Sequence, residues 1–385
     1  MSAFVTDGFW RKSVAAVRGL GRAGIAASVG ESTRLAPALW SRFAAATCVY
    51  PSPWRSPDRF IARLAAECTA RGVRTLIVPE EETLAVVLGR AEALPAGTKL
   101  IGGPRAAFER ARDKWHAIEA ARALGLPVPW TRAPTTEAER VAAVAEAPLP
   151  AVVKPRVGSG AKGVRYVATR EALAGALADV ERAHGPALIQ ERLPAGAEGI
   201  GTSLLLDDEG RVRASFAHRR LREYPVTGGA ATLAESIHAP DLVDAAAHLC
   251  QALGLTGFAM VEWRRDLRDG VATLLEVNPR LWGSLALAIE AGVNFPALAH
   301  AMATGAPPAP PPTYRAGARC RFLVPGDVMH YLRNPARARL DPPFWRFGGN
   351  GPWWDEWSPD DPGPAFGRIA SLWPLLTRAE WRRFL

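Results

Sequence analysis

The sequence predicts an α/β domain followed by an α+β half. In the first hundred residues, short apolar runs alternate with longer amphipathic stretches, which is typical of a parallel α/β domain. From residue 151 onward, glycine-rich and acidic turns join successive strands, which favours antiparallel pairing. The length of 385 residues, at roughly 150 residues per domain, predicts two or three domains.

Composition excludes several classes of protein. With 48% hydrophobic and 22% charged residues, the chain is typical of a folded globular protein and too apolar for wholesale disorder. The net charge of +9 comes mostly from scattered arginines, whereas nucleic-acid-binding surfaces show clustered charge, so we expect no nucleic-acid partner. The N-terminus lacks the apolar core of a signal peptide, and no 18-residue apolar stretch occurs. We therefore expect a cytoplasmic protein without a membrane partner.

The four cysteines are far apart in the sequence and lack the spacing of metal ligands. Neither a disulfide framework nor a zinc site is indicated. We expect four reduced, buried thiols: Cys48, Cys68, Cys250 and Cys320.

The first domain is predicted to span residues 1–110. It should contain strands at residues 3–6, 25–29 and 75–78 and helices at residues 13–20 and 57–71. Gly19, Gly21 and Gly24 match the pattern G-x-G-x-x-G, but this motif follows a helix and precedes a strand. A pyrophosphate-binding loop needs the reverse order, so we expect these glycines to end the helix and turn the chain.

A second domain is expected to begin near residue 111. A helical pattern at 113–124 is closed by Gly125, a typical C-cap. An apolar strand at 151–154 is followed by a glycine-rich loop at 158–163 and by another strand at 164–168. Because a P-loop requires a helix after its glycines, this order predicts a β-hairpin flap. A helix at 170–184 and a strand at 187–190 follow.

Residues 191–305 are predicted to form an α+β unit with antiparallel strands. Strands are expected at 201–206, 257–263 and 272–277, together with one that carries His218, and helices at 241–253 and 282–291. Residues 306–312 are proline-rich and predict a stiff, extended connector. Beyond it lie six tryptophans, which we expect to pack into a core rather than to line a substrate entrance. They are Trp345, Trp353, Trp354, Trp357, Trp373 and Trp381.

Oxygen-bearing side chains recur on the last two predicted strands of this unit. Residues two apart on a strand share a face, so Glu276 and Asn278 should project side by side. Glu262 interrupts the preceding apolar strand and would lie across the hairpin from Glu276. Carboxylates are the ligands that Mg²⁺ takes together with phosphate oxygens, which predicts a magnesium site. The alternative is that these acids form surface salt bridges with Arg264, Arg265 or Arg280.

Two lysines and the glycine-rich loop predict binding of phosphate groups. Lys154 ends an apolar strand, where a surface charge would be unusual, and Lys114 lies near the start of a helix. The loop from Gly158 to Gly163 offers backbone N–H groups with few side chains to obstruct them, and anionic oxygens bind such loops well.

In this order, the motifs resemble those of the ATP-grasp superfamily, and more closely those of its carboxylate-amine ligase-like branch. The resemblance covers most of the chain, through the motifs VTDGFWRKSVAAVRGLGRAG, DKWHAIEAARALGLPVP, VVKPRVGSGAKGV, LIQERL, MVEWRRD and LLEVNPR. It implies a Rossmann-like pre-ATP-grasp domain at residues 1–110 and an ATP-grasp domain at residues 111–305. The latter would have subdomains at about 111–190 and 191–305, and residues 306–385 would form a linker and a Trp-rich C-terminal extension.

The resemblance also implies roles for individual residues. Lys114 and Lys154 would hold the ATP phosphates. A flap would close over them, formed by Gly158, Ser159, Gly160, Lys162 and Gly163. The hinge that meets adenine would be Gln190, Glu191 and Leu193, with Glu198 as the ribose ligand. The ligands of Mg²⁺, or of Mn²⁺, would be Glu262, Glu276 and Asn278. Arg280 would stabilise the phosphorylated intermediate, and a basic strand near the γ-phosphate or the acid substrate would carry Arg219, Arg220 and Arg222.

The implied function is ligation of a small carboxylate to an amine, with an acyl phosphate as the intermediate. The alternatives are an enzyme of the same superfamily that uses bicarbonate, and a non-catalytic ATP-binding scaffold. The superfamily often dimerises, so the resemblance also suggests a homodimer. The sequence does not identify the acid or the nucleophile.

Overall fold

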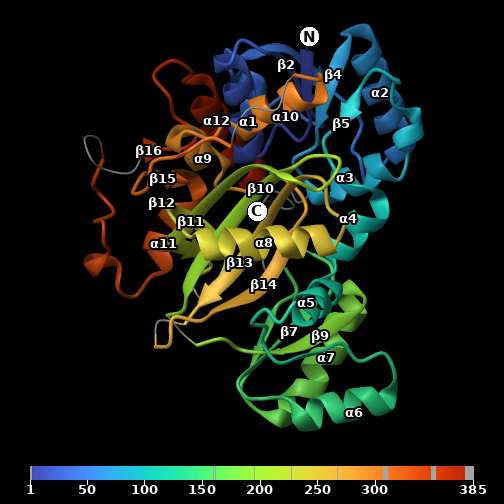
Figure 1. Cartoon of the computed structure of the whole chain (residues 1–385). Helices are drawn as coiled ribbons and strands as arrows, with labels where there is room; N and C mark the ends of the chain where they lie inside the picture. The colour runs from blue at the N-terminus through green and yellow to red at the C-terminus, as the bar shows by residue number, and fades with distance from the viewer. Residues whose placement is uncertain are drawn as a thin grey trace.

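Three β-sheets organise the computed structural model. It describes residues 2–158, 160, 162–194, 196–226, 228–266, 268–306, 311–347 and 353–377. Figure 1 shows the first and the largest sheet in one body, while the smallest sheet forms a lobe at the bottom of the view. The mixed α/β fold that the sequence predicts is confirmed.

The N-terminal sheet has five parallel strands in the order β3-β2-β1-β4-β5. They are β1 (Ser2–Val5), β2 (Ala26–Glu31), β3 (Ala44–Val49), β4 (Val73–Ile77) and β5 (Lys99–Leu100). Phe4 packs on one face with residues of α2 (Pro57–Ala70) and α3 (Glu81–Leu88), and Val5 packs on the other with residues of α1 (Arg11–Arg22). The alternation of side chains along β1 therefore buries both faces of this sheet.

Gly19 and Gly21 lie inside α1, so the prediction that they end this helix is wrong. A Cβ atom on Gly21 would lie 2.6 Å from the Phe43 side chain, and one on Gly19 would lie 2.7 Å from Oδ1 of Asn294. Gly24, with φ of +72°, is the glycine of the three that turns the chain. The first two glycines instead let other segments approach the helix closely.

The small sheet is antiparallel, in the order β6-β9-β7-β8. Its strands are β6 (Thr131–Arg132), β7 (Ala151–Pro155), β8 (Arg165–Val167) and β9 (Ala187–Glu191). The helices α6 (Glu137–Glu146) and α7 (Arg170–His184) belong to the same lobe, and α7 packs on β7, β8 and β9. The predicted strand-loop-strand hairpin corresponds to β7 and β8.

The large sheet has seven strands in the order β14-β13-β10-β11-β12-β15-β16. They are β10 (Glu198–Leu206), β11 (Val212–Tyr224), β12 (Ala230–Ile237), β13 (Gly257–Arg265), β14 (Ala272–Asn278), β15 (Arg319–Arg321) and β16 (Trp353–Trp354). One face packs against α5 (Lys114–Ala123) and α8 (Pro240–Ala252). The other shares a core with α1, α9 (Leu285–Ala291) and α10 (Phe295–Ala303). The remaining helices are α4 (Arg105–Arg112), α11 (Val328–Arg333) and α12 (Gly363–Thr377).

None of the helices in the described ranges has, by itself, the length and hydropathy of a membrane span. The helices α9 and α10 satisfy that test only as a pair, and the chain bends by 86° between them. All four cysteines are buried and free, as predicted.

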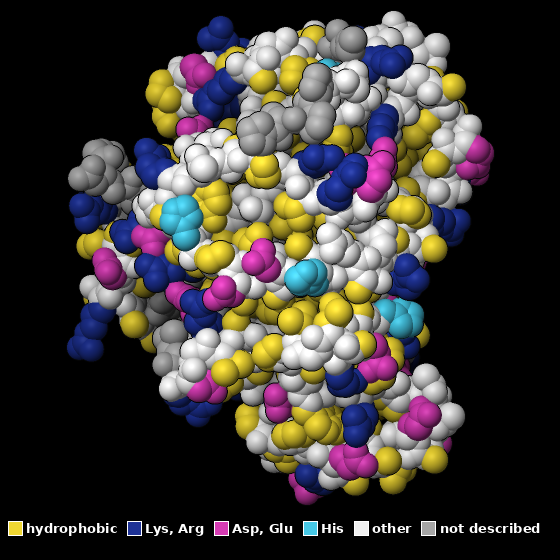
Figure 2. Space-filling view, in the orientation of Figure 1, with side chains coloured by type: hydrophobic (Ala, Val, Ile, Leu, Met, Phe, Trp, Pro, Cys, Tyr) yellow, Lys and Arg dark blue, Asp and Glu magenta, His cyan; other side chains and the backbone are white. Residues whose placement is uncertain are grey.

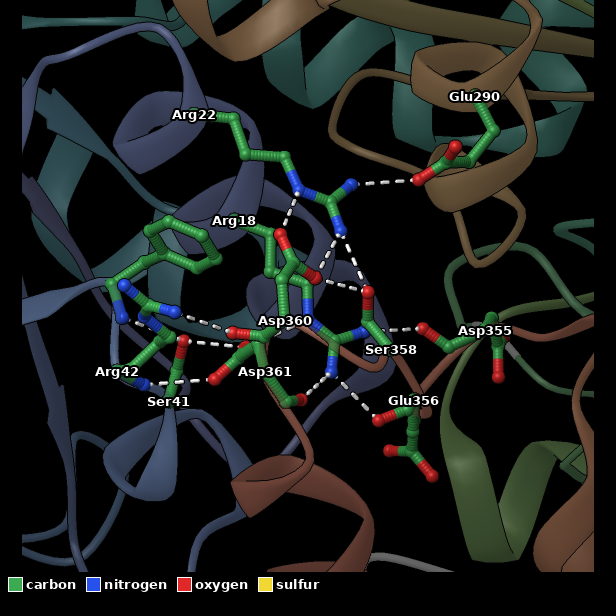
Figure 3. A network of polar contacts seen from close by, with 11 residues as sticks. Arg18, Arg22, Ser41, Arg42, Glu290, Asp355, Glu356, Ser358, Asp360 and Asp361 are labelled. Carbon is green, nitrogen blue, oxygen red and sulfur yellow. Dashed lines mark hydrogen bonds and ion pairs between the residues drawn. The ribbon is translucent and has the colours of Figure 1, made fainter.

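The C-terminal residues return to α1 and to Ser41 and Arg42 of the N-terminal region, where ion pairs and hydrogen bonds fix them (Figure 3). We call this network the C-terminal clamp; its acceptors are Asp355, Glu356, Ser358, Asp360 and Asp361. On α1, Arg18 donates from Nε to Oδ2 of Asp361 at 2.7 Å and from Nη1 to the carbonyl oxygen of Asp355 at 2.8 Å. Both side chains of the Arg18–Asp361 pair are buried.

The tryptophans of the C-terminal region do not form a common core. Trp345 is 70% exposed, Trp373 76% and Trp357 45%, so the core-forming prediction is wrong for these three. Trp353 and Trp354 are half-buried in β16. Ion pairs, rather than packed indole rings, hold much of this segment. Trp381 and residues 307–310 of the predicted connector lie outside the described residues.

Candidate active site

Strands β13 and β14 bring the three predicted oxygen ligands together. Glu262 pairs directly with Glu276, and Met260 pairs with Asn278. The amide nitrogen of Asn278 donates to Oε1 of Glu276 at 3.1 Å. Val261 and Val277 belong to the core on the opposite face of the sheet, which leaves the polar side chains on one face. We call Glu262, Glu276 and Asn278 the oxygen-donor trio.

Cations from two other elements contact the trio. Nζ of Lys114, at the start of α5, lies 3.5 Å from Oε2 of Glu276 and donates to the carbonyl oxygen of Gly158 at 2.6 Å. Arg220, on β11, forms an ion pair with Glu262. The alternative of surface salt bridges with Arg264 or Arg265 is wrong, because those arginines pair with other carboxylates.

Lys154, at the end of β7, is a buried cation near the same carboxylates. Burial and, to a smaller extent, nearby Lys114 lower the pKa of Lys154 to about 8, against the opposite effect of Glu276 and Glu262. Among the described residues, no hydrogen bond or ion pair engages its ammonium group. Because an unpaired buried charge is costly, this arrangement favours an anionic ligand at Lys154.

The electrostatics of Glu276 are set by these cations. Burial raises the pKa of Glu276, but Lys114 and Lys154 act in the opposite direction and are helped by the hydrogen bond from Asn278. The net effect lowers the pKa below its ordinary value. Glu276 is therefore an anion at neutral pH, as a metal ligand must be.

Arg280 joins the trio to α3, a helix that packs on the N-terminal sheet. Its Nη2 donates to Oδ1 of Asn278 at 2.9 Å, and its Nε lies 3.7 Å from Oε2 of Glu81. In the same loop, the carbonyl oxygen of Leu281 accepts from Nζ of Lys12 on α1 at 3.3 Å. The loop that follows β14 thus connects the large sheet to the N-terminal domain beside the trio.

The glycine-rich hairpin between β7 and β8 adopts backbone angles that suit glycine. Gly158, Gly160 and Gly163 all have positive φ, at +144°, +68° and +76°. A Cβ atom on Gly163 would also lie 2.6 Å from the ring of His184. Lys162 is exposed on this hairpin, and Ser159 lies outside the described residues.

The predicted hinge contributes to a cavity of about 300 Å³ beside β9 and β14. Glu191 and Leu193 line this cavity, together with Ala197, Arg264 and Thr273. Gln190 is buried and donates to Oγ1 of Thr131 at 2.9 Å, so its side chain holds β6 and does not line the cavity. Glu198 pairs with Arg219 at 3.4 Å and with Arg265 at 3.7 Å.

Arg222 is not part of this cluster, which corrects the prediction that it lies near the reacting phosphate. It is 3% exposed, and its Nη1 donates to Oδ2 of Asp327 at 2.8 Å. The pairing of β11 with β12 shifts register between Arg220 and Arg222. This bulge breaks the two-residue alternation that would have put both arginines on one face.

Sequence reasoning missed several residues that shape the site. Asp113 caps α5 by accepting from the backbone nitrogen of Trp115 at 2.9 Å, and it pairs with Arg156 at 2.7 Å. An aspartate just before a helical pattern is an N-cap signal that could have identified this contact. His218 and Ser284 form a buried pair at 3.1 Å, which no local pattern predicts.

The donor set fits a metal that is bound together with its substrate. Among the described residues, no three His, Cys, Asp or Glu side chains form a ready-made cage. The trio supplies two carboxylates and one amide oxygen, and Mg²⁺ commonly takes one or two protein carboxylates and completes its shell with phosphate oxygens and water. These residues could therefore hold Mg²⁺ beside a phosphate group.

Comparisons with known proteins identify the fold. Residues 202–323 match a family model described as "ATP-grasp in the biosynthetic pathway with Ter operon". Biotin carboxylase from Campylobacter jejuni superimposes with a TM-score of 0.65 at 17% identity, over 80% of this chain and 72% of that one. N5-carboxyaminoimidazole synthetase from Staphylococcus aureus gives a TM-score of 0.66 at 12% identity, over 89% of this chain and 86% of that one. The chain has the ATP-grasp fold.

Other known proteins also match this chain. An L-amino acid ligase from Bacillus licheniformis gives a TM-score of 0.58 at 17% identity, over 82% of this chain and 75% of that one. Acetyl-CoA carboxylase 2 of Oryza sativa subsp. japonica is 30% identical over 45% of this chain. The large chain of carbamoyl phosphate synthase of Thermus thermophilus is 27% identical over 54% of this chain. The aligned regions span only 8% and 21% of these two proteins.

Proposed function

We propose that this ATP-grasp protein is an ATP-dependent ligase that activates a carboxylate as an acyl phosphate and joins it to an amine. The carboxylate oxygen would attack the γ-phosphorus of ATP and release ADP. The amine nitrogen would then attack the acyl carbon, and phosphate and a proton would leave. The observation that carries the proposal is the buried Lys154 beside the oxygen-donor trio, whose ammonium group has no hydrogen bond or ion pair within the described ranges.

The nucleotide would lie between the small lobe and the large sheet. Lys114 and Lys154 would hold its phosphates under the glycine-rich hairpin, whose exposed backbone suits contact with anionic oxygens. The cavity at Glu191 and Leu193 would receive adenine, and Glu198 would contact the ribose. These roles follow from the resemblance and from the position of each residue around the trio.

Glu262, Glu276 and Asn278 would hold Mg²⁺, or Mn²⁺ in its place. When bound, the metal neutralises phosphate charge and orients the oxygens. The protein's own cations have the same electrostatic task, since an anionic acid and a triphosphate repel each other. Arg220 and Arg280 lie beside the trio and would stabilise the charge of the transferring group, while closure of the hairpin would exclude water.

A second candidate function is supported by the comparisons. A carboxylase of Oryza sativa and a biotin carboxylase of Campylobacter jejuni are among the matches, so bicarbonate is an alternative acid. ADP release that depends on bicarbonate, without any other acid, would favour this function. A homodimer stays a prediction in either case.

Thermal unfolding of wild type and Glu276→Ala, with and without Mg²⁺ and a non-hydrolysable ATP analogue, tests the nucleotide site. A ligand at 100 times its dissociation constant stabilises by about 2.7 kcal/mol, which should raise the midpoint by a few degrees. We expect a magnesium-dependent rise in wild type only. Glu92→Ala, which removes an exposed carboxylate from the N-terminal domain, is the matched control and should behave like wild type. No rise in wild type would remove the main support for the proposal.

Turnover gives the second readout of Glu276→Ala. The variant should lose ATP-dependent ligation by about 10²–10³-fold, because one metal ligand is gone while β14 keeps its buried face. Retained ligation in a folded variant would contradict the assignment of the trio.

A further inference from the structure

One strand, β10, separates a buried imidazole from the oxygen-donor trio. His218 on β11 is 2% exposed, and Gly201 on β10 pairs with both His218 and Glu262. A Cβ atom on Gly201 would lie 2.4 Å from Cε1 of His218. The absence of a side chain at Gly201 therefore gives the imidazole room to lie against β10, on the face that carries Glu262.

Two contacts fix this ring. Its Nε2 lies 3.1 Å from Oγ of Ser284, and it stacks on Phe216 with an interplanar angle of 17°. Within the described residues, the Ser284 hydroxyl has His218 as its one hydrogen-bond partner. The hydroxyl hydrogen is therefore satisfied when Ser284 donates to Nε2, which leaves the ring proton on Nδ1.

This arrangement leaves a donor without an acceptor. In the described part of the chain, Nδ1 of His218 is buried and has no hydrogen-bond partner, and the same holds for Nε of Arg220, two residues along the strand. Burial, assisted by Arg220 and Arg11, lowers the pKa of His218 to about 3, so the ring is neutral at neutral pH. An unsatisfied buried donor costs about 1–3 kcal/mol, and a ligand that accepts from it recovers that free energy.

We infer that Nδ1–H of His218 binds an anionic oxygen next to Arg220, and that this oxygen belongs to the acid substrate or to the phosphoryl group transferred to it. The neighbouring arginines favour an anion over a neutral acceptor. Ser284 lies four residues after Arg280 in the same loop, so the contact also ties the imidazole to the arginine beside Asn278. This inference rests on the proposed function and adds a substrate-binding residue to it.

Two substitutions separate the proposed hydrogen bond from a packing role. Asparagine can place its amide nitrogen near the position of Nδ1, whereas glutamine can reach Ser284 but offers no donor at Nδ1. The test measures the affinity of wild type, His218→Asn and His218→Gln for acetate and for inorganic phosphate, by calorimetry with MgADP present. We expect acetate binding to weaken by about tenfold in His218→Gln and by less than about threefold in His218→Asn. A residue that only anchors Ser284 would give the reverse order.

The two anions identify the source of the oxygen. A loss for acetate assigns it to the carboxylate, and a loss confined to phosphate assigns it to the phosphoryl group. Unchanged affinity for both anions in His218→Gln, with MgADP still binding, would overturn the inference and leave the proposed function intact. Failure of wild type to bind MgADP would remove both.

A measurement on the wild-type protein covers the case in which the variants do not fold. With ¹⁵N-labelled histidine, the NMR signal of His218 should show a proton on Nδ1 and should move on addition of acetate or phosphate in the presence of MgADP. A proton on Nε2, or a signal that neither anion moves, would overturn the inference.

Discussion

The C-terminal clamp and the oxygen-donor trio contain the same kinds of charged residue, but the cations at their centres are paired to different degrees. The difference lies in the cations, because Oδ1 of Asp355 in the clamp is also buried without a hydrogen-bond partner among the described residues. In the clamp, Arg18 donates to the carbonyl oxygens of Asp355, Glu356 and Asp361 and to the carboxylate of Asp361 (Figure 3). Each of its side-chain nitrogens therefore has a partner.

Around the trio, Lys154 lacks a partner among the described residues, and Nε of Arg220 is buried without a hydrogen bond. Nε of Arg280 also has no hydrogen bond and has only the 3.7 Å contact with Glu81. The full pairing of Arg18 indicates a structural role, and the incomplete pairing of the cations beside the trio favours a place for a ligand.

The two regions also differ in the burial of the contacts that hold their segments together. The clamp joins α1 to residues more than 300 positions away through buried contacts. The small lobe, at the bottom of Figures 1 and 2, is joined near the trio by Lys114, which contacts both Gly158 and Glu276, and by the Asp113–Arg156 pair. The comparison predicts that changes in the clamp alter stability, whereas changes around the trio alter ligand binding.

The largest expected effect is on the stability of the clamp. Arg18→Met leaves the buried carboxylate of Asp361 without its main cation, which should lower the free energy of unfolding by about 3–5 kcal/mol. Denaturant unfolding measures this change. The stabilisation that MgADP adds should stay as in wild type, because α1 does not supply the proposed nucleotide ligands. A loss below about 1 kcal/mol would break the comparison.

Lys154→Met should weaken ligand binding without lowering stability, the opposite of what we expect for Arg18→Met. Loss of the buried ammonium should weaken nucleotide binding and reduce turnover by about 10²-fold, since a phosphate contact disappears. The free energy of unfolding should stay constant or rise, because the lowered pKa of Lys154 shows that burial of its charge outweighs the attraction of Glu276 and Glu262. Lys99→Met, at a partly exposed lysine paired with Asp208, is the control and should leave nucleotide affinity within about threefold of wild type. A clearly less stable Lys154→Met protein would assign this lysine to the fold.

The lowered pKa of Lys154 predicts a pH dependence. In the folded protein without nucleotide, its ammonium loses the proton as the pH rises through about 8, whereas the unfolded chain keeps it up to about 10.5. Binding of an anionic phosphate favours the protonated form, so MgADP binding should take up a proton above pH 8 and weaken by at most about tenfold per pH unit. Calorimetry in two buffers with different ionisation enthalpies counts that proton. Lys154→Arg should abolish the uptake; an unchanged uptake would assign it to another group.

Much of the trio was predictable from the sequence because it depends on local pattern. Two-residue alternation put Glu276 beside Asn278, and the hairpin placed Glu262 opposite Glu276, as the register confirms. The direction of Arg222 was not predictable, since a bulge leaves no local signal in the sequence. The same holds for the clamp, where Arg18 and Asp361 are 343 residues apart and only the folded chain brings them together.

The smallest expected change in stability comes from Arg22, an arginine of the clamp whose ion pairs are partly exposed, unlike those of Arg18. Arg22, one turn after Arg18 on α1, pairs with Asp360 at 2.9 Å and with Glu290 at 2.7 Å, but its side chain is 31% exposed. Water screens these pairs, so Arg22→Ala should lower the free energy of unfolding by less than about 1 kcal/mol, and by less again in high salt. Denaturant unfolding at low and high ionic strength measures both values. A loss as large as that of Arg18→Met would mean that the number of ion pairs, rather than their burial, determines the strength of the clamp.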